Sequence, residues 1–189
     1  MTARTSLTHP LRIDELSCQP WATGTIGITF CPGKCGDSLF GSSWQRNLDV
    51  DLDAVKAWGA AIALTLVEEH ELRLLKVPAL GDGFRLRGIQ WHHLPIVDVN
   101  PPGEVFHGLW PSSGVAALRR LREGGKVLVH CRGGLGRAGT VAGALLIELG
   151  ETPERALQKV RAARPGAIET RGQERYLAAY VPMLEREGG

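Results

Sequence analysis

Apolar residues along the chain follow two spacings, and these spacings alternate from one end to the other. Short apolar runs predict buried strands, and apolar residues that recur every three or four positions predict helices. We expect strands over 25–30, 61–67, 89–96 and 127–129, and helices over 48–58, 113–124, 137–149, 153–163 and 170–186. This alternation predicts an α/β fold, with a central, largely parallel sheet flanked by helices.

Helix starts and breaks refine this pattern at two places. Thr152 followed by Pro153 is typical of a helix start, because the hydroxyl caps the first turn and proline needs no donor there. A short helix is expected to begin at Glu68 and to close between Pro78 and Gly83. Its acidic first turn is expected to face solvent.

The periodic pattern begins only after the first twenty residues. Residues 1–20 contain Pro10 and Pro20 and show neither spacing, which predicts an irregular N-terminal arm. The remainder, 21–187, is expected to form a single domain, because a chain of 189 residues is long enough for one proper core.

Composition narrows the class of protein. A hydrophobic content of 43% with 22% charged residues is ordinary for a globular domain. The net charge of +2 argues against a dedicated nucleic-acid binder. No apolar run approaches the ~18 residues that a membrane span needs, so no membrane partner is expected. The first residues lack the apolar core of a secretory signal, and four cysteines suit a reducing compartment, so we expect a cytoplasmic location.

Two cysteines raise the question of a metal site. Cys31 and Cys35 have the spacing of a half-site, but the sequence offers no second Cys or His pair at a matching distance. We therefore expect no metal and no cofactor. A redox role, in which Cys31 or Cys35 forms a disulfide with an oxidised Cys131, is left open. Lys34 between them is expected to be solvated, although it could face an anionic substrate.

The chemistry concentrates in residues 126–140, KVLVHCRGGLGRAGT. A short apolar strand leads to His130 and Cys131, four glycines follow, and a helical pattern begins near Arg137. A strand, a glycine-rich loop and a helix in this order form an anion-binding device, because loop N–H groups and the helix N-terminus both favour negative charge.

Cys131 and Arg137 suit covalent phosphoryl transfer. A thiol held at the base of N–H donors is stabilised as the thiolate, which is the nucleophile. Arg137 can bind two phosphoryl oxygens bidentately. This Cys-x5-Arg arrangement favours thiolate attack, a phosphocysteine intermediate and its hydrolysis. His130 is expected to orient the loop rather than to accept a proton.

A rival motif overlaps the same loop. Gly134, Gly136 and Gly139 match the glycine pattern of dinucleotide-binding folds. That motif requires a following strand that ends in an acidic residue about 20 positions later. Here helices follow instead, so the phosphoryl-transfer interpretation is favoured.

The stretch HCRGGLGR resembles the signature of the cysteine-based protein phosphatases. Two further stretches, HHLPIVDVNPP and RPGAIETRGQERYL, extend the resemblance to the kinase-associated phosphatase family of dual-specificity phosphatases, over about 60–181. The resemblance implies a protein-tyrosine-phosphatase-like domain, a metal-free thiol mechanism, and phosphotyrosine or phosphoserine/threonine substrates. The implied phosphate-binding residues are Arg132, Gly133, Gly134, Leu135, Gly136 and Arg137.

The same resemblance implies a general acid. Asp98 matches the family's acid, which protonates the leaving oxygen. Glu104 is the rival, and Asp98 as a plain turn residue is the simpler alternative. The tripeptide that starts at Trp110 resembles the acid-bearing motif of classical tyrosine phosphatases, but Ser112 cannot donate as an acid. We expect this tripeptide to start a helix.

One position departs from the family. The residue after the arginine is normally Ser or Thr, whose hydroxyl helps the cysteine to leave, whereas this chain has Ala138. The next hydroxyl belongs to Thr140. Related phosphatases of the regenerating-liver type share the alanine, which implies a phosphocysteine that forms faster than it breaks down. Gln173 matches a glutamine that can orient the hydrolytic water, although a surface amide at a helix start is the simpler interpretation.

We therefore expect a cysteine-dependent protein phosphatase that acts on a phosphorylated protein or peptide, as a monomer. Phosphate, sulfate or a similar oxyanion is expected to fit the same loop. One alternative is a phosphate-recognising module with little turnover, which Ala138 favours. A second is an inositol-phosphate or phosphoinositide phosphatase, which usually has several basic residues in the loop, whereas here only Arg132 is charged among the variable positions.

Overall fold

The computed structural model describes residues 3–37 and 42–184. Its main sheet has five strands in the order β1-β2-β7-β5-β6. The strands are β1 Asp14–Ser17, β2 Thr25–Phe30, β5 Ala60–Thr65, β6 Gln90–His93 and β7 Lys126–Cys131, and a separate hairpin pairs β3 Cys35–Gly36 with β4 Trp44–Gln45. The helices are α1 Leu48–Trp58, α2 Glu69–Leu74, α3 Leu80–Leu86, α4 Glu104–Arg122, α5 Gly136–Leu149, α6 Pro153–Ala163 and α7 Arg171–Ala178.

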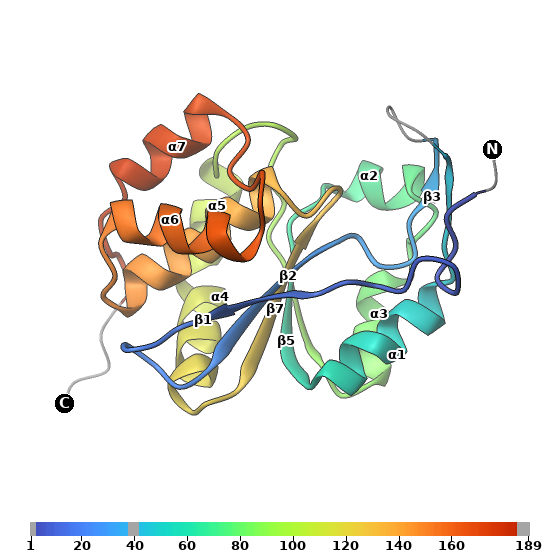
Figure 1. Ribbon diagram of the computed structural model, residues 1–189, viewed down its shortest axis with the longest axis horizontal. Coiled ribbons are helices and arrows are strands. Elements are labelled where there is room, and N and C mark those ends of the chain that lie inside the picture. The colour runs from blue at the N-terminus through green and yellow to red at the C-terminus, as the bar shows by residue number, and fades with distance from the viewer. Residues whose placement is uncertain (1–2, 38–41, 185–189) are drawn as a thin grey trace.

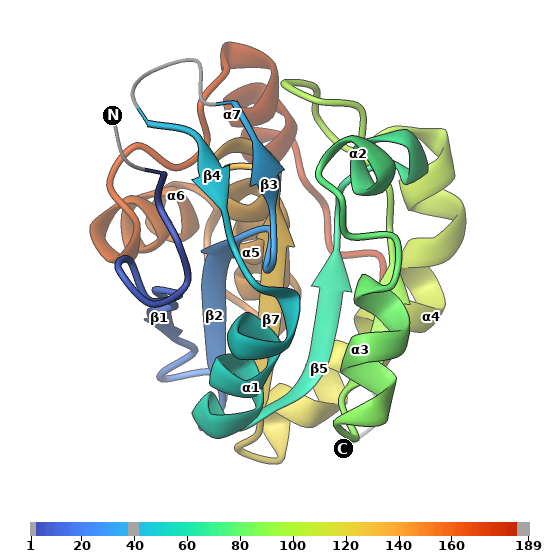
Figure 2. The ribbon, with the colours of Figure 1, turned by 90° about the vertical axis from the view of Figure 1, so that its right-hand side faces the viewer.

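Helices cover both faces of this sheet. Figure 1 shows α4, α5, α6 and α7 on one side of the strands and α1 and α3 on the other. Figure 2 views the sheet through α1 and shows β2, β7 and β5 running side by side. Strands β2, β7, β5 and β6 pair in parallel, and only β1 is antiparallel. The predicted α/β fold with a largely parallel sheet is therefore confirmed.

Strand β7 and helix α5 form the centre of the core. Every residue of β7 after Lys126 is buried, and so is every residue of α5 before Leu149. A strand buried on both faces reads as a continuous apolar run, and a helix buried all round is apolar on every side. This explains why the sequence signal was strong here.

Three predicted helix boundaries are confirmed with their capping residues. The Asn47 side chain accepts the N–H of Val50 at the start of α1. Gly59 ends that helix at φ 92°, a conformation that glycine adopts without steric cost. The Thr152 hydroxyl caps α6, with Pro153 in its first turn.

The prediction of an irregular N-terminal arm is wrong for residues 14–17. These residues form β1 and pair antiparallel with β2, from Asp14 against Ile28 to Ser17 against Thr25. The strand is at the edge of the sheet, and its burial alternates residue by residue. Four alternating residues are too short a signal to stand out in the sequence, so pairing with β2 decides their structure.

Three helix predictions also need correction. Helix α4 begins at Glu104, so Trp110 and Pro111 lie inside it rather than at its start. Trp110 is fully buried and donates its indole N–H to the Tyr180 hydroxyl at 2.8 Å, which makes it a core residue. The expected closure before Gly83 is instead a second helix, α3. Helix α7 ends at Ala178, and the last residues predicted for it, 185–186, lie outside the described residues.

Parallel strands place their carboxyl ends at one edge of the sheet, where ligands bind in such folds. Cys131 ends β7 there, opposite Phe30 at the end of β2 and next to the end of β5. The loop that carries Asp98 leaves β6 at the same edge. Within the described ranges, no helix is both long and apolar enough to cross a membrane.

Candidate active site

The loop between β7 and α5 is held by its carbonyl groups. The Lys34 ammonium donates to the Arg132 carbonyl at 3.2 Å. The Arg164 guanidinium donates to the Gly133 and Gly134 carbonyls, at 3.3 and 3.1 Å. The Leu135 carbonyl accepts the N–H groups of Ile168 and Gly139, at 3.4 and 2.9 Å. Four consecutive carbonyls of the loop therefore bind donors that belong to other segments or to α5.

A trans peptide unit points its N–H opposite to its C=O. The N–H groups of residues 133–136 must therefore point the other way, toward the Cys131 side of the loop. The Gly134 N–H bears this out, because it donates to Cys131 Sγ at 3.2 Å. Gly134 has φ 72°, and a Cβ there would overlap the backbone of Thr29, so only glycine fits.

Arg137 lies in the first turn of α5 and is fixed by a buried carboxylate. Its Nη1 and Nη2 donate to the two oxygens of Glu71, at 2.6 and 2.9 Å, and Nη1 also donates to the Ile96 carbonyl at 2.9 Å. The Arg137 and Glu71 side chains are 1% and 6% exposed. Among the described residues Arg137 Nε has no hydrogen-bond partner, so the Nε edge of the guanidinium is free to bind an oxyanion.

The ion pair shifts both partners toward their charged forms. Burial alone would lower the pKa of Arg137, but the hydrogen bonds to Glu71 and the nearby negative groups raise the pKa above its ordinary value. Burial alone would raise the pKa of Glu71, but the Arg137 hydrogen bonds outweigh burial and lower it from 4.5. The guanidinium therefore keeps its charge in a buried position.

Asp98 reaches the same guanidinium from the loop after β6. Its Oδ1 lies 2.9 Å from Arg137 Nη2, and its side chain is 54% exposed. Val99, the next residue, has φ 58°, which is an outlier for a β-branched residue and marks strain in this loop. Glu104, the rival acid, begins α4 and makes no recorded contact with Arg137. Of the two carboxylates, Asp98 is the one that contacts Arg137.

His130 lies below the loop and is fully buried. Its Nε2 is 2.7 Å from the Thr65 hydroxyl, which also accepts the Trp91 indole N–H at 2.8 Å. The indole can only donate, so the hydroxyl accepts from it and also forms a hydrogen bond with Nε2. Burial lowers the pKa of His130 to about 3. This neutral ring connects β7 with β5 directly below the loop, and the role of orienting the loop stays a prediction.

A second carboxylate reaches into the loop. Glu169 Oε2 accepts the Gly136 N–H at 2.7 Å. Because the Leu135 carbonyl of the same peptide unit is held outside, this N–H points inward, and the Glu169 carboxylate lies on the inner side. Ile168, just before it, has φ 60°, a second strained β-branched residue next to an acid. Glu169 was not expected from the sequence as a site residue.

Gln173 joins three segments of the site. It is fully buried, and its Oε1 accepts the N–H groups of Glu169 and Thr170, at 3.0 and 3.2 Å. Its Nε2 donates to the Asn100 carbonyl in the Asp98 loop at 3.3 Å. The interpretation of Gln173 as a plain surface amide is therefore wrong, because tertiary packing buries the start of α7.

The position after Arg137 provides no hydroxyl. Ala138 is fully buried, and the Thr140 hydroxyl donates to the Gly136 carbonyl at 2.8 Å, one turn back in α5. Thr140 therefore supports the helix backbone and makes no recorded contact with Cys131 Sγ.

Two other expectations at this edge are wrong. Glu71, expected in a solvated helix start, is buried on Arg137. Lys34, expected in solvent, is buried, with its ammonium 4.5 Å from the Phe30 ring and 4.3 Å from the Trp44 ring. Burial lowers the pKa of Lys34 to about 8. Both side chains are charged, and only tertiary contacts could reveal their burial.

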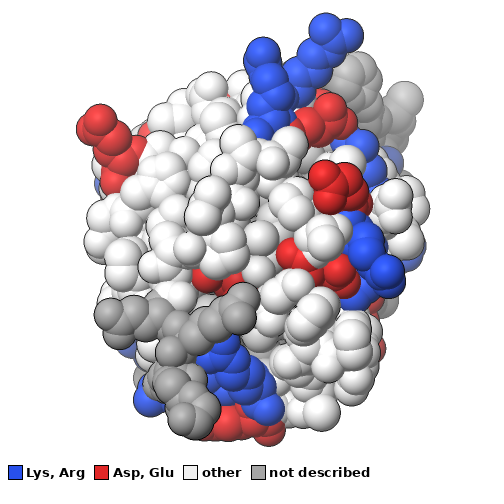
Figure 3. Space-filling model, turned by 90° about the vertical axis from the view of Figure 1, so that its left-hand side faces the viewer, with Lys and Arg blue, Asp and Glu red and all other residues white. Residues whose placement is uncertain are grey.

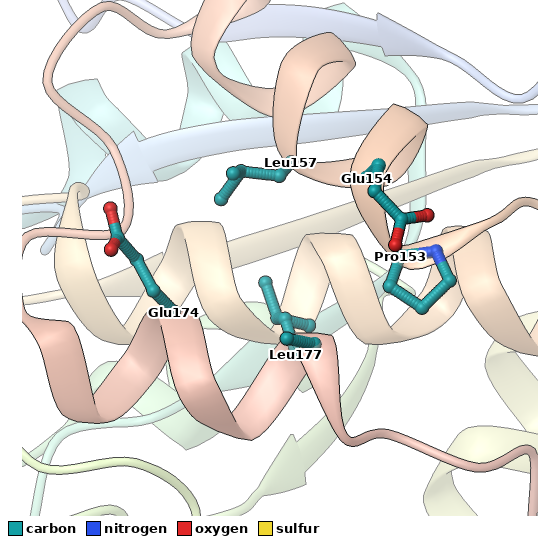
Figure 4. A pocket seen from close by; sticks show the side chains of 6 residues that line it. Pro153, Glu154, Leu157, Glu174 and Leu177 are labelled. Carbon is teal, nitrogen blue, oxygen red and sulfur yellow. The ribbon is translucent and has the colours of Figure 1, made fainter.

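The described cysteines are all free thiols, including Cys31, whose pKa burial raises. Within the described residues, no cluster of His, Cys, Asp and Glu could hold a metal ion. A shallow hollow of about 90 Å³ between α6 and α7 has Leu157 and Leu177 on its floor and Glu154 and Glu174 beside them (Figure 4). None of the residues that surround Cys131 lines it.

Comparison with known proteins agrees with this geometry. Residues 38–177 match the family model described as Swiss Army Knife protein, DSP-PTPase phosphatase domain. The chain belongs to this phosphatase family. Cyclin-dependent kinase inhibitor 3 of Homo sapiens is 36% identical over 148 residues, which cover 74% of this chain and 66% of that protein, slightly less than two thirds. Protein tyrosine phosphatase type IVA 3 of Homo sapiens is 36% identical, over 73% of this chain and 74% of that protein.

A solved structure shows the same phosphatase fold. The crystal structure of kinase associated phosphatase, with its catalytic-site cysteine replaced by serine, is 30% identical and covers 91% of this chain and 98% of that chain. The TM-score is 0.74. The similarity that three short motifs indicated in the sequence therefore extends over 91% of the chain.

The Glu71–Arg137 pair predicts how the phosphatase domain responds to acid. Because the pKa of Glu71 is lowered on folding, its stabilising effect is present above 4.5 and is lost as pH falls through the folded value. We expect Glu71→Gln to lower the free energy of unfolding at neutral pH by about 2–3 kcal/mol. Urea unfolding is measured at neutral pH and below pH 4.5. The free energy of unfolding should fall less between these two conditions in Glu71→Gln than in wild type. The matched control is Glu69→Gln, which removes an exposed ion pair. An equal decrease in the free energy of unfolding in all three proteins would contradict the prediction.

The Glu169 carboxylate predicts weak binding of free oxyanions. It holds an inward N–H and brings a negative charge to the place that a phosphoryl oxygen needs. We expect Glu169→Gln to raise the affinity for inorganic phosphate at least about fivefold, measured by isothermal titration calorimetry. Glu174→Gln, which breaks an ion pair with Arg161, is the control. Equal affinities of wild type and Glu169→Gln would show that the carboxylate does not compete.

Proposed function

We propose that this chain is a cysteine-dependent phosphatase that hydrolyses phosphate monoesters on tyrosine or on serine and threonine of proteins. One observation carries the proposal: the loop carbonyls are held outside, so that the N–H groups converge beside Cys131 Sγ, with Arg137 fixed across from it. Such donors can bind the three phosphoryl oxygens, which carry negative charge in the transition state, without rearrangement of the loop.

The proposed reaction has two steps. The Cys131 thiolate attacks phosphorus, an S–P bond forms, and the P–O bond to the substrate breaks while Asp98 gives a proton to the leaving oxygen. Water then attacks the phosphocysteine, the S–P bond breaks, and inorganic phosphate and the thiolate are released. The carboxylate of Asp98 is the group that takes the proton from this water.

Arg137 would bind the phosphoryl group through its Nε and Nη2. Glu71 holds the far end of the guanidinium, while Nε has no described partner and Nη2 contacts Asp98. A phosphoryl oxygen that takes the Nη2 contact frees Asp98 to turn to the leaving oxygen. The oxyanion would thus displace one carboxylate without breaking the buried pair with the other.

The names of the relatives support a protein substrate. Kinase associated phosphatase and protein tyrosine phosphatase type IVA 3 are both at least 30% identical to this chain. The inositol-phosphate alternative is not favoured. We also propose that the protein acts as a monomer in a reducing compartment such as the cytoplasm, because one chain supplies Cys131, Arg137 and Asp98 and its described cysteines are free thiols.

The mechanism predicts the behaviour of two variants. Cys131→Ser should abolish hydrolysis of p-nitrophenyl phosphate. Asp98→Asn should lower kcat about 100-fold on a phosphothreonine peptide, and less on p-nitrophenyl phosphate, whose leaving group needs little protonation. Initial rates without added metal test both.

Glu104→Gln, at the start of α4, is the control that should leave the rate on p-nitrophenyl phosphate unchanged. Activity that persists in Cys131→Ser would contradict the proposed mechanism. Phosphopeptide binding without any wild-type turnover would favour the recognition module instead, the candidate that Ala138 supports.

Ala138 predicts slow breakdown of the phosphocysteine. No described hydroxyl contacts the thiol, so the departing thiolate lacks a donor that Ser would supply. We expect a burst of p-nitrophenol near one equivalent in rapid mixing, and we expect Ala138→Ser to raise the steady rate about tenfold, the worth of one hydrogen bond to a charged group. Ala142→Ser, one turn further along α5, is the control. A wild-type time course without a burst would count against this proposal.

A further inference from the structure

A groove beside the Asp98 loop has no part in the chemistry described above. It has a volume of about 370 Å³ and lies between the end of β6 and the start of α4. Its apolar lining comes from Pro95, Ile96, Val97, Pro101, Val105 and Phe106.

The lining combines a packed floor with exposed walls. Ile96 and Phe106 are buried, whereas Val97 and Val105 are 56% and 63% exposed. Apolar side chains that converge on a hollow, while they remain in contact with water, are typical of ligand-binding surfaces. A small aryl phosphate held at Cys131 does not need this groove, so it suits a larger substrate.

The groove is negatively charged. Glu68 and Glu104 also line it, and no Lys, Arg or His is among the described lining residues. The Arg137 guanidinium, which binds the Ile96 carbonyl, is buried and paired with Glu71. Because the described lining has two carboxylates and no basic residue, it favours a cationic side chain on the bound molecule.

By contrast, the side of the molecule that carries α6 and α7 shows a broad uncharged area, bordered on the right of the view by mixed acidic and basic side chains (Figure 3). Nothing in the structure indicates what would cover that face. The groove, by comparison, combines an apolar lining with charge and lies near the catalytic residues.

The groove adjoins the active site through shared chain segments. Ile96, one of its lining residues, accepts a hydrogen bond from Arg137 Nη1 through its carbonyl at 2.9 Å, and Asp98 is two residues further along. A general acid touches the leaving oxygen, so the substrate chain must pass over the Asp98 loop. One residue of extended chain spans about 3.5 Å, which brings the neighbours of the phosphorylated residue to the groove.

We propose that this groove binds the substrate segment next to the phosphorylated residue, and that it selects an apolar side chain followed or preceded by Lys or Arg. The apolar side chain packs against Val97 and Val105, and the cation lies between Glu68 and Glu104. This inference rests on the proposed function, and it names the class of substrate: a phosphoprotein segment that is both apolar and basic.

The test is a set of phosphopeptides that differ only at the residues flanking the phosphorylated one. We expect replacement of a flanking Leu by Ser to lower kcat/KM about tenfold, because a buried side chain of that size is lost. Replacement of a flanking Arg by Glu should lower kcat/KM about fivefold, the upper range for one exposed charge pair. Equal kcat/KM values across the set would overturn the proposal.

Two groove variants and one control locate the effect. Glu104→Lys should remove the preference for Arg and favour the Glu peptide, and Val105→Ser should weaken the preference for Leu. Glu154→Lys, on α6 and outside the groove, should leave both preferences intact. All three should hydrolyse p-nitrophenyl phosphate at the wild-type rate. Peptide preferences that persist in Glu104→Lys and Val105→Ser would assign the selection to another surface.

Failure of the proposed function would be recognised separately. If wild type hydrolyses neither p-nitrophenyl phosphate nor any peptide, fluorescence anisotropy of the same labelled peptides with Cys131→Ser measures binding alone. A rank order that favours Leu and Arg, from which Glu104→Lys in the Cys131→Ser background removes the Arg preference alone, would support the groove without turnover. The same affinity for all peptides would reject it.

Discussion

The outward hydrogen bonds of four consecutive loop carbonyls are the constraint on which the site depends. Lys34, Arg164, Ile168 and α5 supply the donors, and the opposed N–H groups then converge on the Cys131 side. A glycine-rich loop has little conformational preference of its own, so without these donors its amides would point in many directions. Catalysis that relies on fixed dipoles needs them oriented before the substrate arrives.

Charge at this edge of the sheet is balanced rather than simply positive. Arg137 is buried, and its charge is held by Glu71 on one side and met by Asp98 on the other. Glu169 adds a negative group inside the loop, and Gln173 ties that segment to the Asp98 loop. Two strained residues, Val99 and Ile168, precede or follow these acids, and such strain persists only where surrounding contacts enforce it. Under the proposed mechanism, a phosphoryl group enters a site that already contains carboxylates, and its binding exchanges their contacts.

Most of the fold could be read from local patterns. The alternation of apolar runs predicted β2, β5 and β7 and most helices, because these central strands are buried on both faces and largely apolar. Strand β6 was also predicted, although its residues are exposed or half-buried. The caps Asn47 and Thr152 act within one turn of their helices and leave a local trace. Strand β1 and the first turns of α4 left none: a four-residue edge strand and a helix with Gly and Pro inside it depend on packing against neighbours.

The sequence by itself determined the candidate reactive groups, since Cys131 and Arg137 lie in one short motif whose spacing follows from the strand, the loop and the helix. It could not reveal Glu71, Lys34, Arg164 or Glu169, which lie between 30 and 98 positions away from their partners in the loop or in Arg137. Each is a charged residue whose default environment is solvent. Only the tertiary structure decided that they are turned onto the loop, because a charge is buried only where folding brings a partner to it.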